Sequence, residues 1–429
     1  MKKNILIKIT AVLFSSLLIS CVPVKQKAAP QVPIPKARPA EEVVEVEEEA
    51  VDQPNWKEVP SLKEAYSKYF DYFGFAVPYN QLTNAELMEG LSYQASCFTC
   101  ENECKPDFIF AWVKPTSVVD FIAEDGKAYK VPGNKLAGLN QLASILSIAK
   151  NNGMIMRGHV LVWHSQTPDW FFKENYNSES AYVDKATMNA RLEWYIKSVL
   201  EFVKTWEQEN NNGKHIIITW DIVNEACTDG ASDVNPLRTQ SPWYSIFKDD
   251  TFIVNAFRYA NKYAPKDVKL AYNDYSCYSP AKTNAICQVV QDIQKAKDAR
   301  IDVVGMQSHV SMTYPGVASY ETAVKRFLEL GVDVQVTEME IASGGRAVTQ
   351  AQLKDEYAKY FNLFLKYRKV PGKNGISGVT LWGTKDEVSW IRNNSDANNK
   401  VQRPLIFEKD YECKPAFFGV LETAQNYAD

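Results

Sequence analysis

The stretch IIITWDIVNEA, residues 216–226, decides the fold. It begins as an apolar run typical of a strand buried on both faces, and it continues into Asn224 and Glu225. An unpaired charge inside a core is costly, so a carboxylate at the end of such a strand needs a partner or a function. The role of Glu225 therefore depends on where this strand ends in the fold.

Seven other short apolar runs have the same character, and longer segments with helical spacing, such as 135–153, 189–208 and 319–331, lie between them. The seven runs are FGFAV (73–77), ASCFT (95–99), MIMRGHVLVW (154–163), VKLAYN (268–273), DVVGMQ (302–307), VDVQVT (332–337) and ISGVTLW (376–382). Eight buried strands that alternate with helices predict an α/β fold, a closed parallel (β/α)8 barrel. A doubly wound open sheet is the alternative, but no glycine-rich phosphate turn follows the first run.

The composition bounds the class of function. The 429 residues carry a formal charge of −4 with no basic cluster in the body, which argues against nucleic acid as a partner. Aromatic residues make up 12% of the chain. This content suits stacking on sugar rings, although a well-filled core explains it equally well.

The N-terminal residues read as an export signal followed by a tether. Residues 1–21 combine lysines at positions 2, 3 and 8 with an apolar stretch that is too short for a spanning helix. LISC (18–21) resembles the bacterial lipobox, which makes Cys21 the expected lipidation site; a plain signal peptide is the alternative. Residues 22–55 are rich in proline and glutamate, as in a disordered linker, so the catalytic domain is expected at 56–429.

Seven cysteines remain after Cys21: Cys97, Cys100, Cys104, Cys227, Cys277, Cys287 and Cys413. An odd number in an exported chain leaves at least one free thiol or an intermolecular bond. Cys97, Cys100 and Cys104 have spacings that suit a metal site but lack an evident fourth ligand. A local disulfide or inert thiols are therefore the favoured interpretations.

Polar residues gather where the predicted strands end. In a barrel of this kind the active site lies at the carboxyl ends of the strands, so these side chains should converge. They are Glu101, Asn102, Lys105, Trp163, His164, Gln166, Asn224, Glu225, Asn273, Asp274, Gln307, His309, Glu338, Trp382, Asp386 and Trp390.

Two of them, Glu225 and Glu338, close the fourth and seventh strands. Two carboxyl groups about 5 Å apart leave no room for water on the far face of a sugar, so one must attack it directly, with retention of configuration. Mutual repulsion would raise the pKa of one group and keep it protonated as an acid. The alternative, a turn cap at Glu225 and a salt bridge at Glu338, does not explain the other polar strand ends.

Several longer motifs together resemble glycoside hydrolase family 10, the endo-β-1,4-xylanases, from about Tyr66 to the C-terminus. They are GHVLVWHSQTPDWF (158–171), WDIVNEA (220–226), SPWY (241–244), YNDYS (272–276), MQSH (306–309), VTEMEI (336–341), LWGTKDEVSW (381–390) and PLIFEKDYECKPAF (404–417). The resemblance implies that Glu225 is the acid/base and Glu338 the nucleophile.

The resemblance also assigns the surrounding residues. Gln307 and His309 match the pair that positions the nucleophile, and Asn224 matches an amide that contacts the sugar in the cleavage subsite. The next sugar on the non-reducing side would be bound by Glu101, Asn102 and Lys105. His164, Trp382 and Trp390 match residues around the cleaved sugar, with the tryptophans as its hydrophobic walls.

Three departures from the family pattern stand out. Glu340 occupies a place where the family usually has aspartate, so its hydrogen bond to His309 would have to be re-aimed. Cys104 stands where methionine is common. Residues 113–133 are expected to form an added loop that could shape the cleft on the non-reducing side.

The main hypothesis is an exported endo-xylanase, held at the membrane by a lipid on Cys21 on the cell surface or the periplasmic side. It would act on xylan and xylo-oligosaccharides as a monomer, without metal or organic cofactor. A β-1,4-glucanase on the same barrel and a non-catalytic surface lipoprotein that captures polysaccharide are the alternatives. Bulky Trp382 or Trp390 should exclude the hydroxymethyl group of glucose.

Overall fold

The computed structural model describes residues 53–230, 235–392 and 402–428. The predicted signal peptide with Cys21, and residues 22–52 of the predicted linker, lie outside the described residues. The first described residues join the folded body, because Asn55 Nδ2 donates to the carbonyl oxygen of Asp410 at 2.8 Å. No helix in the described ranges is long and apolar enough to cross a membrane.

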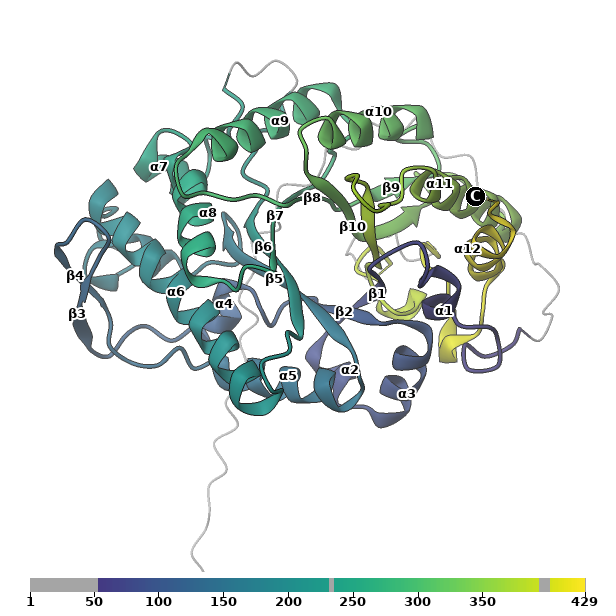
Figure 1. Cartoon of the computed structure of the whole chain (residues 1–429), viewed down its shortest axis with the longest axis horizontal. Coiled ribbons are helices and arrows are strands. Elements are labelled where there is room, and N and C mark those ends of the chain that lie inside the picture. The colour runs from purple at the N-terminus through teal and green to yellow at the C-terminus, as the bar shows by residue number, and fades with distance from the viewer. Residues whose placement is uncertain (1–52, 231–234, 393–401, 429) are drawn as a thin grey trace, which may run out of the picture. The chain divides into compact units, whose positions relative to one another are not determined.

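Eight parallel strands form a closed barrel surrounded by helices, which confirms the predicted fold (Figure 1). In their order around the barrel they are β1 (Tyr72–Val77), β2 (Cys97–Cys100), β5 (Ile155–Trp163), β6 (Ile217–Asn224), β7 (Lys269–Asp274), β8 (Val303–Met306), β10 (Asp333–Ala342) and β11 (Ile376–Leu381). Pairing of β11 with both β10 and β1 closes the ring. All eight predicted runs became these strands, because strands covered on both faces need continuous apolar sequence.

The main helices pack outside the barrel, and four of them begin at a residue whose side chain caps the first turn. They are α1 (Leu62–Tyr66), α3 (Ala85–Gln94), α5 (Leu139–Asn151), α6 (Lys185–Asn210), α8 (Thr251–Tyr263), α9 (Pro280–Lys295), α10 (Val317–Leu328), α11 (Gln350–Lys366) and α12 (Pro415–Asn426). Short helices α2 (Tyr79–Leu82), α4 (Pro106–Ile109) and α7 (Pro242–Phe247) lie in the connections. Helix α6 starts four residues before the predicted 189–208, because Asp184 accepts a hydrogen bond from the backbone of Thr187 and caps it.

Residues 113–133, expected as an added loop, contain an antiparallel hairpin of β3 (Val118–Ile122) and β4 (Ala128–Pro132). Both carboxylate oxygens of Glu124, in its turn, accept from Arg258 of α8 at 2.9 Å. The backbone N–H of Glu124 donates to Glu193 of α6 at 2.8 Å. These contacts fasten the hairpin to the outer helices, beside α6 in Figure 1.

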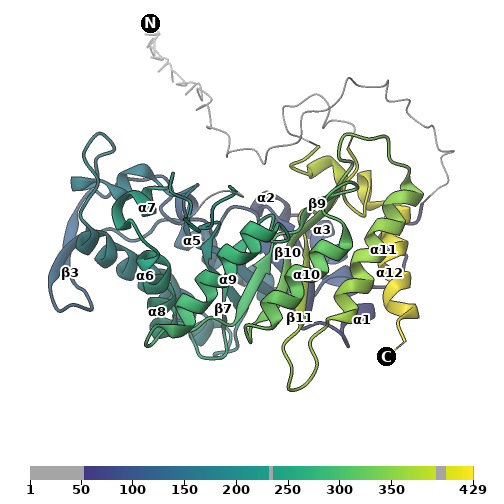
Figure 2. The same ribbon diagram turned by 90° about the horizontal axis from the view of Figure 1, so that it is seen from above.

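Strand β10 continues beyond its last pair with β8, which is Val336 with Met306. The extension pairs instead with the short strand β9 (His309–Ser311), which lies beside β10 in Figure 2. This pairing sets Glu340 opposite His309. A register shift against β11 falls between Val336 and Met339, as in a β-bulge. Bulges re-aim side chains, and this one contains Thr337 and Glu338.

Candidate active site

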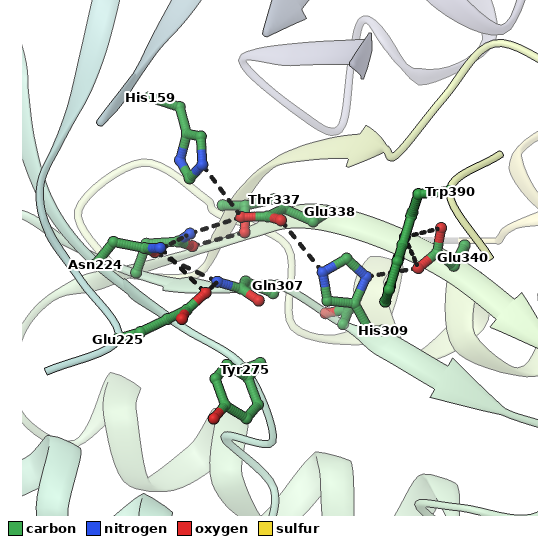
Figure 3. A network of polar contacts seen from close by, with 12 residues as sticks. His159, Asn224, Glu225, Tyr275, Gln307, His309, Thr337, Glu338, Glu340 and Trp390 are labelled. Carbon is green, nitrogen blue, oxygen red and sulfur yellow. Dashed lines mark hydrogen bonds and ion pairs between the residues drawn. The ribbon is translucent and has the colours of Figure 1, made fainter. Parts of the chain in front are cut away.

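Glu225 lies immediately after β6, at the mouth of the barrel, and its carboxylate accepts from three side chains, two of which, Asn224 and Gln307, are seen in Figure 3. Gln307 Nε2 and Asn224 Nδ2 donate to Oε1 at 2.9 and 3.1 Å, and Trp163 Nε1 donates to Oε2 at 3.0 Å. The residue adopts a left-handed backbone conformation (φ 53°), which is uncommon outside glycine and clusters at functional sites. The chain is thus turned so that this carboxylate is held by partners from three strand ends.

Glu338 is only 5% exposed and is held from both sides. Asn273 Nδ2 donates to Oε1 at 2.8 Å, and His309 Nε2 lies 3.2 Å from Oε2. Burial by itself would raise the pKa of this carboxyl, but the charges of His159 and His309, together with these donors, lower it to about 2. Glu338 is therefore an ionised carboxylate at neutral pH, although it is buried.

Two amides connect the two glutamates, so both carboxylates face one site (Figure 3). Asn273 Nδ2 bridges Glu338 Oε1 and Asn224 Oδ1, the latter at 2.9 Å, and Asn224 in turn donates to Glu225. The hydroxyl of Thr337 donates to Asn273 Oδ1 at 2.7 Å. That bond fixes which end of the Asn273 amide points at the carboxylates. The strand ends thus bring Glu225 and Glu338 together, as their positions in the sequence predict.

His309 lies between two carboxylates. Its Nδ1 is 2.6 Å from Glu340 Oε1, on the side opposite Glu338. Burial favours the neutral imidazole, yet Glu340 and Glu338 outweigh that effect and raise the pKa of His309 to about 10. Glu340, the residue that departs from the family pattern, therefore reaches His309 and keeps it charged.

Residues expected on the non-reducing side form a second group next to Glu225. Lys105 Nζ donates to Asn102 Oδ1 at 3.1 Å and to Gln166 Oε1 at 2.9 Å, and it lies 5.1 Å from the centre of the Trp163 ring. Burial raises the pKa of Glu101 to about 7 and lowers that of Lys105. The group offers donors and acceptors beside an aromatic face, a combination that suits sugar hydroxyls.

Two tryptophans and two histidines are arranged around Glu338. Trp382 packs edge-on against His159 and His309, with ring centroids 5.6 and 6.4 Å apart, and Trp390 packs against His309 at 5.3 Å. His164, expected beside the cleaved sugar, lines a small cavity with Trp163, Trp243 and the acid/base candidate Glu225. Its Nδ1 is buried without a hydrogen-bond partner, and burial lowers its pKa to about 3.

A second histidine that faces Glu338 is His159, which sequence analysis did not single out. Its Nε2 is 4.0 Å from Glu338 Oε1, and its Nδ1 lies 2.9 Å from Asp221 Oδ2. Asp221 also pairs with Arg157 through two bonds of 2.6 and 3.1 Å inside the barrel. The charged residues that interrupt two apolar strands, Arg157 and Asp221, were the available signal for this support.

A further charged cluster lies on the other side of Glu225. Arg238 Nε donates to the backbone oxygen of Glu225 at 3.1 Å, and its Nη2 donates to the hydroxyl of Tyr275 at 2.8 Å. Buried Lys282 pairs with Asp274 at 2.9 Å and with Asp229 at 2.7 Å. This cluster fixes the loops that follow β6 and β7, and Tyr275 faces Glu225 in Figure 3.

The cysteines contribute no visible cross-link or ion site within the described ranges. All seven after Cys21 are buried free thiols. Burial raises the pKa of Cys97 to about 12, which makes it unreactive. No group of three or more histidine, cysteine, aspartate or glutamate side chains in the described part of the chain could hold a metal ion.

Comparison with known proteins places the chain among glycoside hydrolases. Residues 61–423 match the model of glycosyl hydrolase family 10. The chain is 36% identical over 365 residues to a bifunctional endo-1,4-β-xylanase of Ruminococcus flavefaciens, covering 85% of this chain and 34% of that protein. It is 31% identical over 381 residues to an endo-1,4-β-xylanase of Butyrivibrio fibrisolvens, covering 84% of each.

Solved structures of xylanases also resemble this chain. An endo-1,4-β-D-xylanase of Clostridium thermocellum, complexed with xylohexaose, matches with a TM-score of 0.71 and 30% identity, over 86% of this chain and 69% of that one. The chain spans only 31–34% of the length of several curated relatives, including the protein of Ruminococcus flavefaciens.

Proposed function

Because the chain belongs to glycosyl hydrolase family 10, we propose that it is an endo-1,4-β-xylanase that cuts internal linkages of xylan with retention of configuration. The observation that carries the proposal is the pair Glu225 and Glu338, connected through Asn224 and Asn273. Most glycoside hydrolases use two carboxyl groups that flank the glycosidic bond. The relatives are named endo-1,4-β-xylanases, and these names indicate xylan as the polymer that is cut.

In the first step an oxygen of Glu338 attacks the anomeric carbon, while Glu225 gives its proton to the oxygen of the leaving chain. The bond between that carbon and the leaving oxygen breaks, and an ester bond to Glu338 forms. The low pKa of Glu338, about 2, supports its role as the attacking anion. Asn273 and His309 hold its two oxygens in place for the attack.

In the second step a water molecule enters where the leaving chain was. Glu225 removes a proton from the water, the water oxygen bonds to the anomeric carbon, and the ester bond to Glu338 breaks. Two inversions restore the original configuration. The donors from Gln307, Asn224 and Trp163 hold the Glu225 carboxylate over the same spot in both steps.

The substrate preference follows from the walls of the site. Trp382 and Trp390 both pack against His309, next to the nucleophile, so a sugar there must fit between bulky rings. Xylose lacks the hydroxymethyl group that glucose carries at C5. Asn102, Lys105 and Gln166 then bind the next sugar on the non-reducing side through its hydroxyl groups.

The test is reducing-sugar release from xylan and from β-1,4-glucan by the same purified protein. We expect kcat/KM on xylan to exceed that on glucan by about 10–200-fold, the range that one extra group in an apolar pocket produces. The viscosity of xylan should fall early, because internal bonds are cut. Equal rates on both polymers would favour the glucanase alternative, and binding without release would favour polysaccharide capture.

We also propose that the chain is exported and anchored by a lipid on Cys21. The support is the sequence alone: lysines 2, 3 and 8, the apolar stretch, and LISC at 18–21. Cells that express the protein should incorporate labelled palmitate into the wild type and not into Cys21→Ala. An unlabelled but exported wild type would indicate a plain signal peptide.

A further inference from the structure

Glu340 binds two partners at once. Its Oε1 lies 2.6 Å from His309 Nδ1, and Trp390 Nε1 donates to both of its oxygens, at 2.8 and 3.0 Å. The side chain of Glu340 is completely buried, whereas Trp390 is 48% exposed. A single carboxylate therefore links the histidine beside the nucleophile to the exposed tryptophan at the mouth of the site (Figure 3).

The bond to Glu340 decides how the Trp390 ring is held. An indole has one polar atom, which can only donate, so Glu340 is the partner that orients it. The loop before Trp390 is anchored by Asp386, which binds Lys414 Nζ at 2.7 Å and accepts from the backbone of Leu405 at 2.7 Å. That anchor fixes the backbone, and Glu340 fixes the ring against the edge of His309.

The length of the side chain explains why both contacts form. The Cα atoms of Glu340 and His309 are directly paired across β10 and β9, so a carboxylate here needs little reach to meet the imidazole. The hydrogen bond between the carboxylate of Glu340 and charged His309 is also stronger than the one from the neutral indole of Trp390. An aspartate at this place would keep His309, and the additional methylene of glutamate is what extends the carboxylate to Trp390.

We propose that Glu340 is a positioning residue that holds Trp390 as the wall of the cleavage subsite through the same carboxylate that bonds to His309, so that sugar selection and positioning of the nucleophile share one side chain. The inference rests on the proposed function, because it assigns Trp390 to the sugar at the cleavage point. The two duties are separable by substitution. Glu340→Asp should remove the first and Glu340→Gln the second, whereas Trp390→Phe removes the indole donor together with part of the aromatic ring.

The hydrogen bond from Trp390 to Glu340 can be tested without substrate, in protein carrying ¹⁵N-tryptophan. The indole signal that disappears in Trp390→Phe belongs to Trp390, and bonding to a carboxylate should place its proton downfield of those of solvent-exposed indoles. In Glu340→Asp that signal should move upfield or broaden, while the other indole signals keep their positions. An unmoved Trp390 signal would contradict the claim that Glu340 positions Trp390, whether or not the protein cleaves xylan.

Kinetics test the consequence for the sugar. Glu340→Asp and Trp390→Phe should each lower kcat/KM on xylan about tenfold, the size expected for one hydrogen bond to a charged group. The double variant should be no worse than either single one, since both remove the same contact. Trp206→Phe, at a partly buried tryptophan on α6, is the matched control and should change kcat/KM little. Losses that multiply in the double variant would overturn the shared contact.

The titration of His309 tests the second duty. The charged or titratable groups that act on Glu340 are His309, Glu338, Glu101 and Tyr357. In Glu340→Gln the pKa of His309, about 10 in the wild type, should fall, because the carboxylate that raises it is gone. The imidazole signals of His309, followed by NMR in protein carrying ¹⁵N-histidine, should therefore titrate at lower pH than in the wild type.

Trp390→Phe identifies the cause of such a movement. It keeps the charge on Glu340 and should leave the titration of His309 in place. An unchanged titration of His309 in Glu340→Gln would overturn the tuning role.

Discussion

Replacing Glu338 by alanine should abolish nearly all hydrolysis of xylan. In the proposed mechanism this side chain supplies the attacking oxygen, and neither Asn273 nor His309, its hydrogen-bond partners, can replace a carboxylate. We expect kcat to fall by roughly 10⁴-fold or more, the scale on which covalent nucleophiles act. Reducing-sugar release from xylan is the measurement.

The matched control is Glu89→Ala. Glu89 lies on α3, where its side chain is 70% exposed and pairs with Lys57. This variant should keep wild-type activity, since an exposed ion pair contributes little to stability. Thermal unfolding of both variants would show that the barrel is intact. Undiminished hydrolysis by Glu338→Ala, in folded protein, would remove Glu338 from the nucleophile's role.

The second large effect is expected for Glu225→Ala. Loss of a general acid and base costs about 10²–10⁴-fold, so xylan hydrolysis should fall by that factor. On an aryl xylobioside with an acidic phenol, the phenolate leaves without protonation. The rate of the first step on this substrate should therefore fall less than the rate on xylan. Azide, which needs no base to attack, should restore turnover and give the β-azide.

Azide also tells the two glutamates apart. In Glu225→Ala it attacks the ester on Glu338, which gives a product of retained configuration. In Glu338→Ala it could react only from the side of the missing nucleophile, which gives the inverted azide. A β-azide from Glu338→Ala, or no effect of azide on Glu225→Ala, would contradict the assigned roles.

The barrel was predictable from the sequence because parallel strands covered on both faces read as apolar runs, and the runs from the second onward lead into polar residues. Convergence of Glu225 and Glu338 followed from that topology alone. The hairpin within 113–133 was missed, although Asp125 and Gly126 between two strand-like runs are a turn signal. Gly126 adopts the left-handed conformation (φ 77°) that such a turn requires.

The histidines were harder to assign for a physical reason. His159 and His164 lie five positions apart on and just after β5, and counting alternate residues should tell which one points inward. The register of β5 against β6 shifts between His159 and Val162, so the count fails there. Likewise, the bond from Trp390 to Glu340 joins a loop to a strand 50 positions away, and no local pattern predicts it.

The central claim is that Glu225 and Glu338 act on the two sides of one sugar with direct attack by Glu338. The most direct measurement is the anomeric configuration of the first product, followed by proton NMR while xylohexaose is being cut and before mutarotation. Direct attack predicts that the β-anomer appears first and the α-anomer only later. Initial formation of the α-anomer would mean that water attacks in a single displacement, and would contradict the account.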